Sequence, residues 1–523
     1  MFNQELPPAL SLATLFFLCG HVLSVTTDRF CYAGQSCYPS SNQRAVFAKS
    51  INNRVVLPFD EEYNRLVQLQ NVRETRFPNL IVTPTSTEEV QKTVIFARKF
   101  NLRMSIISSG HDYFGRSTWD GSLQMNMRNL SDVHVNLTSS RHADGEVSVG
   151  AGSTWLKVYT KLDAHDRVVV GGSAHTVTVG GYTLGGGHSP MSRMFGLAVD
   201  NLLEVELVLA DGSKAVASAD GTEITSPDGN VNKTTDSGLF WASRGGGGGT
   251  FGVTTKFTFK IHQAATGMVN LGIVFPMLLA NGTFIGDTVL EKVSEILLNG
   301  PAEWGGYLLT DGITDQDGSV GHIILFFNHY GAWDTASRRY MDQLYNFHPE
   351  WSKQRFYVNY TSFLEYEKTV IDAQYYRTYV SNILMNNQSF TPEWRKTMLN
   401  LAFRFPRNSS VVRATGAWIG GKVHDVGIND TSVHPGFRES YLALTTALGW
   451  EGDGEHEDDF IAEGIKIMND LRPYGIGSYR NEGSPDTNDW KGDFWGSNYD
   501  RLLAIKRLYD PDNVFTCIDC VGK

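Results

Sequence analysis

The sequence predicts an α+β protein, and three observations point to this fold class. The chain has 523 residues, which is long enough for two domains with sizeable hydrophobic cores. Its first half is rich in glycine turns and short strand patterns. After about residue 262, strand patterns alternate with helical ones, as in an antiparallel sheet that helices cover on one face.

The first predicted unit is strand, helix, strand. Residues 80–82 form an apolar strand that ends before Pro84, and residues 104–107 form the second strand. Between them, Ser86 and Glu89 predict a capping box at the start of a helix. Apolar residues then recur at helical spacing at Val90, Val94 and Ala97. The second strand leads directly into a glycine-containing turn at residues 108–111.

The second half carries the alternating pattern. The alternation at Val269, Leu271 and Ile273 predicts a half-exposed strand. Further strands are predicted at residues 323–327 and 420–425. An amphipathic helix is predicted around Val289, Leu290, Val293 and Leu297, and another around Ala336, Tyr340 and Leu344. A further helix is predicted at residues 499–508.

Bulk charge argues against two classes of ligand. The net charge is −11 and no stripe of Lys and Arg is present, so we expect no nucleic-acid partner. The acidic run at residues 455–459 lacks a recognisable ligand spacing, so we predict a solvated loop and no metal site.

The N-terminus and the cysteines indicate secretion. Residues 10–20 form an apolar run too short to span a bilayer, and residues 1–24 are predicted to be a signal peptide. The alternative is an uncleaved anchor or a disordered N-terminus, because this region lacks Lys and Arg. No later segment is long and apolar enough to span a membrane. Four cysteines remain after residue 24, and three disulfide connectivities stay open for Cys31, Cys37, Cys517 and Cys520. Eight Asn-x-Ser/Thr sites predict a glycoprotein.

Five glycine clusters lie between residues 150 and 249. Glycine lets a backbone approach a bulky anion, and successive amide groups can surround phosphates. Gly150-x-Gly152 lacks the third glycine of a Rossmann fingerprint, so a nicotinamide site of that type is not supported. The clusters therefore favour a large phosphate-bearing ligand bound in another way.

Six motifs, in this order, resemble the berberine-bridge-enzyme-like branch of the vanillyl-alcohol-oxidase superfamily, with its PCMH-type FAD-binding domain. They are residues 108–113 (SSGHDY), 177–188 (VTVGGYTLGGGH), 196–201 (GLAVDN), 239–253 (LFWASRGGGGGTFGV), 494–502 (FWGSNYDRL) and 509–515 (YDPDNVF). The resemblance implies an FAD-binding domain of two α+β subdomains, a substrate domain with an antiparallel sheet, and a C-terminal segment that returns to the FAD domain. The implied boundaries are 25–75 for an N-terminal segment, 76–261 for the FAD domain, 262–470 for the substrate domain and 471–523 for the C-terminal segment.

The resemblance implies that His111 bonds covalently to the flavin. Many relatives add a second bond from a cysteine, but Ala174 stands at the matching position here. We therefore expect a single covalent bond, and a narrower site in which an oligosaccharide substrate is less expected. Val177 stands where the family sets oxygen access, and its small side chain resembles that of members that react with O2. The expected cofactor-binding residues are Ser108, Ser109, Gly110, His111, Asp112, Tyr113, Thr176, Val177, Gly180, Gly181, Thr183, Gly185, Gly186, His188, Gly252, Val253, Asn498 and Tyr499.

The base that removes a substrate proton is expected near the flavin. Residues 479–482 stand where relatives carry a Tyr-x-Asn motif, which makes Tyr479 the first candidate. A tyrosine with an ordinary pKa near ~10 needs a cationic neighbour to act as a base, and Lys422 is the expected one. Glu482 is the second candidate. His424 and Asp425 remain possible parts of the wall.

The resemblance implies an FAD-dependent oxidase that acts on a small alcohol, sugar, amine or secondary metabolite, with O2 as acceptor and hydrogen peroxide as product. Two alternatives stay open. One is a dehydrogenase that uses another electron acceptor, and the other is a secreted flavin-fold protein that binds or defends with little turnover. The oligomeric state and the substrate are not predicted.

Overall fold

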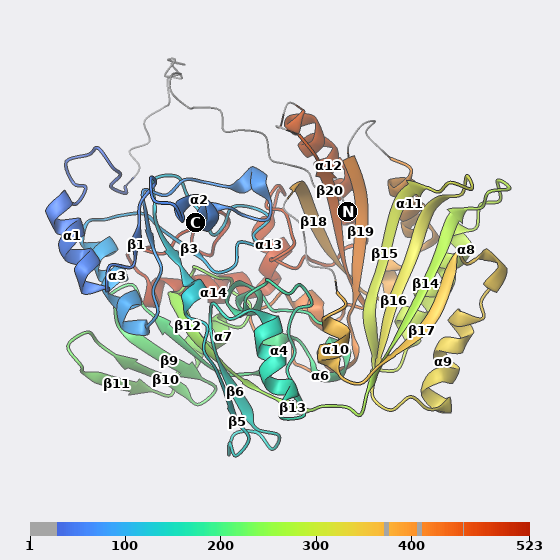
Figure 1. Ribbon diagram of the computed structural model, residues 1–523, viewed down its shortest axis with the longest axis horizontal. Coiled ribbons are helices and arrows are strands. Elements are labelled where there is room, and N and C mark those ends of the chain that lie inside the picture. The colour runs from blue at the N-terminus through green and yellow to red at the C-terminus, as the bar shows by residue number, and fades with distance from the viewer. Residues whose placement is uncertain (1–28, 371–375, 405–409, 453, 455) are drawn as a thin grey trace.

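The structure is a computed structural model that describes residues 29–370, 376–404, 410–452, 454 and 456–523. The predicted signal peptide lies outside the described residues. Three sheets organise the chain (Figure 1), two in the half that contains α1 to α7 and one in the half that contains α8 to α12. Within the described residues, no helix is both long and apolar enough to cross a membrane.

The first sheet contains the predicted strand-helix-strand unit. Its order is β1-β2-β4-β3, with β2 and β3 both parallel to β4 and β1 antiparallel to β2. The strands are β1 (Val55–Val56), β2 (Leu80–Val82), β3 (Met104–Ile107) and β4 (Leu123–Asn126), and the helices of this region are α1 (Ser41–Ser50), α2 (Tyr63–Val67) and α3 (Thr87–Lys99). Strand β4 thus lies between the two predicted strands.

Helix α3 begins as predicted, but its capping box is incomplete. The Ser86 hydroxyl accepts a hydrogen bond from the Glu89 backbone N–H. The Glu89 carboxylate does not reach back to Ser86; it accepts from the backbone N–H and the hydroxyl of Thr85 instead. The bond from the Ser86 backbone N–H to the Glu89 side chain, which a complete capping box requires, is therefore replaced by the bonds from Thr85.

The second sheet has seven antiparallel strands in the order β11-β10-β9-β8-β12-β6-β5. They are β5 (Val133–Asn136), β6 (Glu146–Gly150), β8 (Leu202–Val208), β9 (Lys214–Ser218), β10 (Gly221–Thr225), β11 (Val231–Thr234) and β12 (Val253–Lys260). Around it lie the two-strand pair β7 (Arg167–Val168) and β13 (His262–Gln263), and the helices α4 (Trp155–Asp163), α5 (Val179–Leu184), α6 (Ser192–Phe195) and α7 (Gly238–Ala242).

The C-terminal segment packs back onto this half of the molecule. Helix α14 (Tyr499–Tyr509) lies beside α7, and α13 (Trp490–Trp495) packs against α14 (Figure 1). Phe494, Trp495 and Leu502 belong to the same hydrophobic core as strands β6, β8 and β12. The buried Lys506 ammonium ties the two together, because it donates to the backbone carbonyl oxygens of Thr250 and Phe515.

The third sheet is the predicted antiparallel one, with the order β17-β14-β16-β15-β19-β20-β18. Its strands are β14 (Met268–Leu278), β15 (Trp304–Thr314), β16 (Val320–Tyr330), β17 (Gln354–Tyr360), β18 (Arg377–Met385), β19 (Ser410–Trp418) and β20 (Leu442–Trp450). The helices of this half are α8 (Gly286–Asn299), α9 (Thr335–Tyr345), α10 (Phe363–Glu367), α11 (Pro392–Ala402) and α12 (Glu457–Leu471). Residues of α8, α9, α11 and α12 form one hydrophobic core with the strands, so helices cover one face.

Side chains alternate across this sheet, as the pleat requires. On β20, Leu442 and Leu444 enter the core under the helices, whereas Ala443, Thr445 and Ala447 face the other way. That second face forms one wall of a large cavity. The helix-covered face therefore holds the sheet together, and the opposite face is left for a ligand.

Two predictions for the second half are wrong. Strand β14 is not half-exposed, because β16 and β17 flank it and nearly all of its residues are buried, including Asn270 and Gly272 between the apolar positions. The Phe356 ring covers Gly272, and Asn270 donates to the side chain of Asn328. Residues 420–425 form no strand, since positive φ angles at Gly420 and Gly421 start a short 3-10 turn at Gly421–Val423.

Candidate functional site

The main cavity lies between the third sheet and the glycine-rich loops, and its volume is about 550 Å³. It is lined by the turn after β3, by residues 172–182 and 248–252, by β19 and β20, and by the segments 479–482 and 515–517. A volume of this order is typical of small-molecule and cofactor sites. Thirteen of the sequence-predicted site residues line it: Ser108, Ser109, Gly110, His111, Asp112, Tyr113, Val177, Gly180, Gly181, His188, Gly252, Tyr479 and Glu482.

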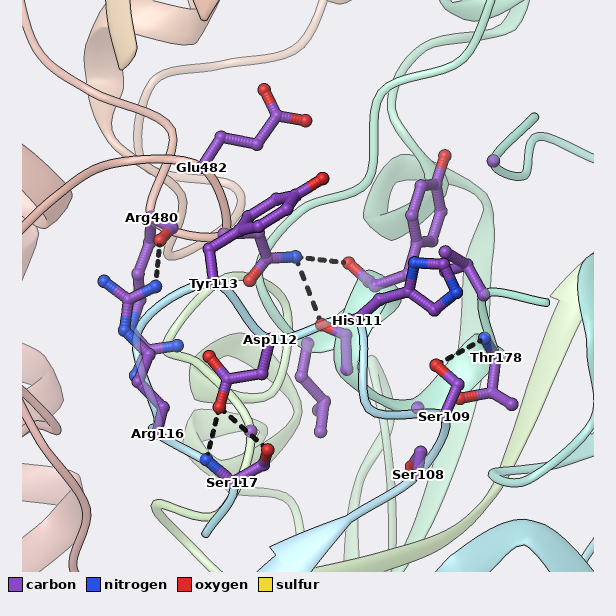
Figure 2. A pocket seen from close by; sticks show the side chains of 18 of the residues that line it. Ser108, Ser109, His111, Asp112, Tyr113, Arg116, Ser117, Thr178, Arg480 and Glu482 are labelled. Carbon is purple, nitrogen blue, oxygen red and sulfur yellow. Dashed lines mark hydrogen bonds between the residues drawn. The ribbon is translucent and has the colours of Figure 1, made fainter. Parts of the chain in front are cut away.

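The turn at residues 108–113 is held in place by bonds to its own backbone. Gly110 has a φ of +88°, a conformation that favours glycine. The Arg128 guanidinium donates to the carbonyl oxygens of Ser108 and Ser109 at 3.1 and 2.7 Å. The Asp112 carboxylate accepts from the backbone N–H of Ser117 at 2.6 Å, and Figure 2 shows this bond at the edge of the pocket. The turn that presents His111 is therefore rigid.

The His111 imidazole points into the pocket beside the second glycine loop (Figure 2). Its Nε2 forms a hydrogen bond of 2.6 Å with the Thr176 hydroxyl. The Ser109 hydroxyl accepts from the backbone N–H of Thr178 at 3.3 Å, which joins the two loops a second time. Thr176 itself does not line the cavity, so it acts on the site by orienting His111.

If FAD bonds covalently to His111, as the resemblance implies, replacing Thr176 with valine is expected to slow formation of that bond. The change keeps the side-chain shape but removes the hydroxyl that orients the imidazole. A neutral hydrogen bond contributes about 0.5–1.5 kcal/mol, which corresponds to a roughly 2- to 10-fold slower attachment. The time course of acid-stable flavin after adding FAD to apoprotein measures this rate. A serine variant, which keeps a hydroxyl, should attach flavin like the wild type.

Three glycines leave open space beside the cavity. A Cβ built on Gly181 would meet no atom within 4 Å, and Cβ atoms on Gly248 and Gly249 would meet only ordinary contacts at 3.6 and 3.9 Å. All three line the cavity, so side chains there would fill it. Backbone amides exposed in this way suit a pyrophosphate. The residues present therefore fit the large phosphate-bearing ligand that the glycine pattern predicted, and the FAD that the resemblance implies.

Seven predicted cofactor-binding residues do not line this cavity: Thr176, Thr183, Gly185, Gly186, Val253, Asn498 and Tyr499. Gly185 is glycine for packing, because a Cβ there would lie 2.1 Å from the Asn481 side chain. Val253 belongs to the hydrophobic core under the first sheet. The Asn498 amide donates to the Val433 carbonyl at 2.8 Å, and the Tyr499 hydroxyl accepts from the N–H of Gly522, so both hold the C-terminal segment.

The expected role of Lys422 is not supported. Its side chain is 61% exposed on the 3-10 turn, and its ammonium pairs with the Asp425 carboxylate at 2.9 Å. It does not line the cavity that contains Tyr479. The sequence placed Lys422 on a strand facing Tyr479, and the glycine turn removes that strand.

Tyr479 and Glu482 both line the cavity. The Tyr479 hydroxyl oxygen accepts from the backbone N–H of Gly187 at 3.2 Å and from the Asn481 amide at 2.9 Å. Burial, with the neighbouring charge of Glu482, raises the pKa of Tyr479 well above its usual range. The phenol is therefore neutral near pH 7.

The pKa of Glu482 is shifted in the opposite direction, below its usual range. Its carboxylate contacts Nε2 of His188 at 2.9 Å and accepts from the Thr445 hydroxyl on β20. Burial works against its ionisation, but the charge and hydrogen bond of His188 and the bond from Thr445 outweigh burial and lower the pKa of Glu482. The cavity wall thus contains a half-buried carboxylate, Glu482, that is ionised near pH 7.

A second acid lies behind the wall and was missed by the sequence reasoning. Glu367, at the end of α10, is fully buried, and one of its oxygens accepts from the Ser173 hydroxyl at 3.1 Å. Burial raises the pKa of Glu367 to about 8, so the group is neutral near pH 7. Ser173 and Tyr307 line the cavity in front of it. No motif marks Glu367, because only the packing of α10 brings it here.

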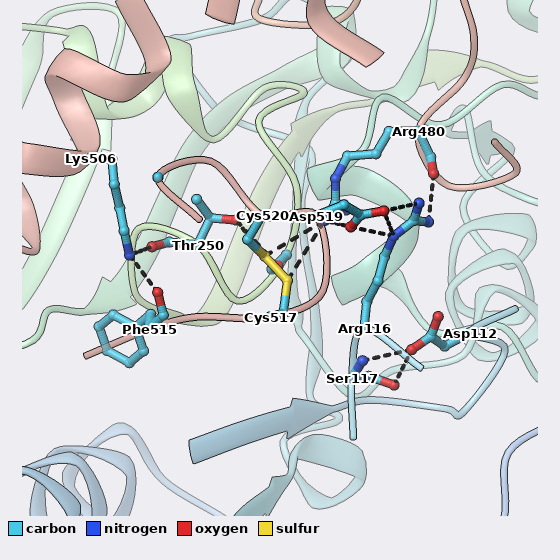
Figure 3. Close-up of a disulfide and its surroundings, with 12 residues drawn as sticks. Asp112, Arg116, Ser117, Thr250, Arg480, Lys506, Phe515, Cys517, Asp519 and Cys520 are labelled. Carbon is cyan, nitrogen blue, oxygen red and sulfur yellow. Dashed lines mark hydrogen bonds and ion pairs between the residues drawn. A yellow bond between two sulfur atoms is a disulfide. The ribbon is translucent and has the colours of Figure 1, made fainter. Parts of the chain in front are cut away.

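Residues 515–517 of the C-terminal segment also line the cavity. The sequence analysis did not predict these residues as part of the site. Of the three possible connectivities, the chain adopts Cys31–Cys37 and Cys517–Cys520. Cys517 lines the cavity, but its sulfur is committed to Cys520 (Figure 3).

A buried ion pair holds this segment in place. The Arg116 guanidinium, 8% exposed, donates to the Asp519 carboxylate at 2.7 to 3.0 Å and to the Arg480 carbonyl at 2.7 Å. The Arg480 guanidinium lies 3.6 Å from the same carboxylate (Figure 3). Arg116 and Asp519 are 403 positions apart in the sequence. Their ion pair therefore joins the segment that follows the His111 turn to the C-terminal segment.

Comparison with known proteins agrees with the geometry. Residues 78–217 match the family model described as "FAD binding domain", and residues 478–518 match "Berberine and berberine like". A VAO-type flavoprotein oxidase of Thermothelomyces thermophilus is 31% identical over 507 residues, covering 91% of this chain and 80% of the relative. An uncharacterized FAD-linked oxidoreductase of Arthroderma benhamiae is 30% identical, covering 85% and 77%.

Solved structures share the fold. A VAO-type flavoprotein from Myceliophthora thermophila superposes with a TM-score of 0.78 at 21% identity, over 94% of this chain and 97% of the other. A chitooligosaccharide oxidase superposes with a TM-score of 0.74 at 19% identity, over 91% and 98%. At this identity the likeness concerns the α+β fold alone. Taken with the sequence relatives, these matches show that the chain belongs to the VAO-type, berberine-bridge-enzyme-like family of FAD-linked oxidoreductases.

Proposed function

We propose that this protein is an oxidase that oxidises a small molecule at a carbon next to an alcohol oxygen or an amine nitrogen. The observation that carries the proposal is one cavity that contains both the His111 turn and an ionised carboxylate, Glu482. When bound, FAD accepts a hydride from such a carbon and passes two electrons on to O2, which gives hydrogen peroxide. The protein's own residues then have three tasks: to hold the cofactor, to remove a proton, and to admit oxygen.

The proton is removed by Glu482 rather than by Tyr479. A general base must be deprotonated at the working pH and within hydrogen-bond reach of its substrate. The lowered pKa of Glu482 meets the first condition, and its place in the cavity wall meets the second. Tyr479 has a raised pKa and accepts two hydrogen bonds, so its own proton remains to be donated to a substrate oxygen.

The cofactor is held through His111, with Thr176 orienting the imidazole. Ala174 and the Cys517–Cys520 disulfide leave no thiol on the described part of the cavity wall, so we propose that His111 makes the only covalent bond. Residues 180–181 and 248–249 line the same cavity, and we propose that their backbone amides bind the pyrophosphate.

Val177 supports O2 as the acceptor. It lines the cavity as a half-buried side chain that also packs against the core of the second sheet. A small side chain at this point leaves room for a diatomic molecule, whereas a larger one would narrow the passage.

The Val177→Leu variant is expected to reoxidise more slowly in air while its anaerobic reduction by substrate keeps its rate. Forcing an extra methylene into packed surroundings costs about 1–3 kcal/mol, which corresponds to a roughly 5- to 160-fold slower passage. Stopped-flow mixing of the reduced enzyme with O2 measures the rate. Equal reoxidation rates for the two proteins would remove Val177 from the oxygen path.

The substrate is proposed to be small. A cavity of about 550 Å³ has to contain most of the cofactor as well as the substrate. The residues that line it include Tyr307, Tyr376, Arg413 and Thr415, so both aromatic and polar side chains are available to a substrate. One solved neighbour is named a xylooligosaccharide oxidase, yet the single predicted tether at His111 favours a narrower site and a smaller alcohol, sugar, amine or secondary metabolite.

An oxygen-consumption screen over alcohols, sugars and amines tests the proposal, with hydrogen peroxide measured alongside. Oxygen uptake matched by peroxide identifies an oxidase. Reduction of the flavin without oxygen uptake would show a dehydrogenase that needs another acceptor. Background signal over the whole panel, with flavin that no compound reduces, would favour a binding protein.

We also propose that the protein enters the secretory route. Disulfides such as Cys31–Cys37 and Cys517–Cys520 persist in oxidising compartments. Mature protein should begin near residue 25 and become smaller on treatment with an N-glycosidase. An intact N-terminus with no change in size would contradict this.

A further inference from the structure

Three potential metal ligands converge outside the cavity. His142 and Asp144 lie in the turn between β5 and β6, and His262 lies on β13. One ring nitrogen of each histidine and one Asp144 carboxylate oxygen all lie within 4.8 Å of one another, and the three residues are half-buried. None of them lines the flavin cavity.

The backbone fixes this convergence. The Ile261 N–H donates to the Gly145 carbonyl at 3.2 Å, which docks the β5–β6 turn on the start of β13. Gly145 has a φ of +97°, and a Cβ there would lie 2.6 Å from the Asn136 carbonyl oxygen, so only glycine fits the turn. The two histidine rings meet edge to face, with centroids 5.6 Å apart.

Each histidine has a ring nitrogen that is available to bind a cation. His142 Nδ1 is buried and has no hydrogen-bond partner, although an unpaired polar atom in the interior is costly. His262 has its Nε2 within 2.7 Å of the Asn201 side-chain oxygen, which therefore accepts the Nε2 proton and leaves the lone pair on Nδ1. Phe195 stacks on the same ring at 4.1 Å. A second group that fixes the tautomer and the ring plane is the usual support of a metal-binding histidine.

The cluster combines two imidazoles with one carboxylate. Neutral imidazole is the form that binds metals. Asp144 supplies the negative charge that a divalent cation needs.

We propose that His142, Asp144 and His262 form a site for Zn²⁺ or a similar divalent transition metal. Two imidazoles and a carboxylate are a ligand set that zinc accepts, with water in the fourth position. Zinc bonds of about 2.0–2.1 Å place neighbouring ligands about 3.3 Å apart. The side chains therefore move closer together on binding, and the turn position of His142 and Asp144 permits this.

The consequence of binding is mechanical rather than catalytic. The metal clips the β5–β6 turn to residues 261–268, the segment through which the chain passes from the second sheet to β14 of the third. The site would stabilise the junction between the FAD-binding half and the substrate half. It acts independently of the flavin chemistry proposed above.

Bound zinc is measured on flavin-loaded, full-length protein after equilibrium dialysis against micromolar Zn²⁺, by elemental analysis per chain. The wild type should bind one zinc more than His142→Ala, Asp144→Asn and His262→Ala. His134→Ala is the matched control, since this exposed residue lies on β5 outside the cluster and its loss should change nothing. Weak surface binding contributes equally to all five proteins.

Asp144→Asn keeps the shape of the turn, so it tests the site in a protein that folds; circular dichroism and retained flavin verify this for each variant. Zinc should also raise the unfolding temperature of the wild type and of His134→Ala, and leave that of Asp144→Asn unchanged. Equal zinc content in the wild type and Asp144→Asn, or no bound zinc in the wild type, would overturn the proposal.

Discussion

Replacing Glu482 with glutamine is expected to lower the rate of flavin reduction by about 10²- to 10⁴-fold with any substrate that the oxygen screen identifies. Glutamine keeps the size of the side chain and can still bond to His188 and Thr445, but it cannot take a proton. Anaerobic stopped-flow absorbance measures the rate directly. Because His111 and the glycine loops remain unchanged, flavin content should remain that of the wild type.

The matched control is Tyr479→Phe, which removes the neighbouring hydroxyl and leaves the carboxylate. It should cost less than Glu482→Gln, since a lost hydrogen-bond donor contributes about 0.5–1.5 kcal/mol. A larger loss in Tyr479→Phe than in Glu482→Gln would assign the base to the tyrosine.

The pH dependence has a definite sign. Glu482 acts as a base only when ionised, and its pKa is lowered by His188 and Thr445 in spite of burial. Rates should therefore hold at neutral pH and fall only when the pH drops through this lowered pKa. In Glu482→Gln that acidic limb should disappear from the pH profile of kcat/KM. A limb of unchanged position would belong to another group.

Replacing His111 with alanine is expected to abolish acid-stable flavin entirely. The variant lacks the ring nitrogen that would bond to the cofactor, while the glycine loops that surround the phosphates stay intact. After acid precipitation the yellow colour should move from the pellet to the supernatant. Wild-type protein should keep its flavin in the pellet.

The control for His111→Ala is His175→Ala, which removes a nearby histidine that bonds instead to the Glu367 carbonyl oxygen. This variant should retain acid-stable flavin. Acid-stable flavin in His111→Ala at the wild-type level would disprove attachment at His111, and loss in both variants would point to a general disturbance of the loop.

The sequence predicted those parts of the fold that depend on local pattern. Strands β2 and β3, helix α8 and helix α14 appear where hydrophobic spacing placed them, because each buries one side against a core. The His111 turn was also predictable, since it follows directly from a strand and a positive-φ glycine.

Other features depend on contacts between distant segments. Lys422 was misplaced because two glycines replace a predicted strand by a turn, and β14 proved buried because β16 and β17 flank it and the Phe356 ring covers Gly272. Asp519 reaches Arg116 across 403 positions, and the packing of α10 alone puts Glu367 behind the cavity wall. Spacing along the chain carries no signal for such pairs.

One measurement tests the central claim most directly, which is that substrate oxidation passes through flavin held in this cavity. Wild-type enzyme is mixed anaerobically with a compound that consumes oxygen in the screen, and O2 is then admitted. The visible flavin absorbance should bleach in one phase and return with one hydrogen peroxide formed per flavin. Oxygen consumption without bleaching, or bleached flavin that stays reduced in O2, would contradict the account.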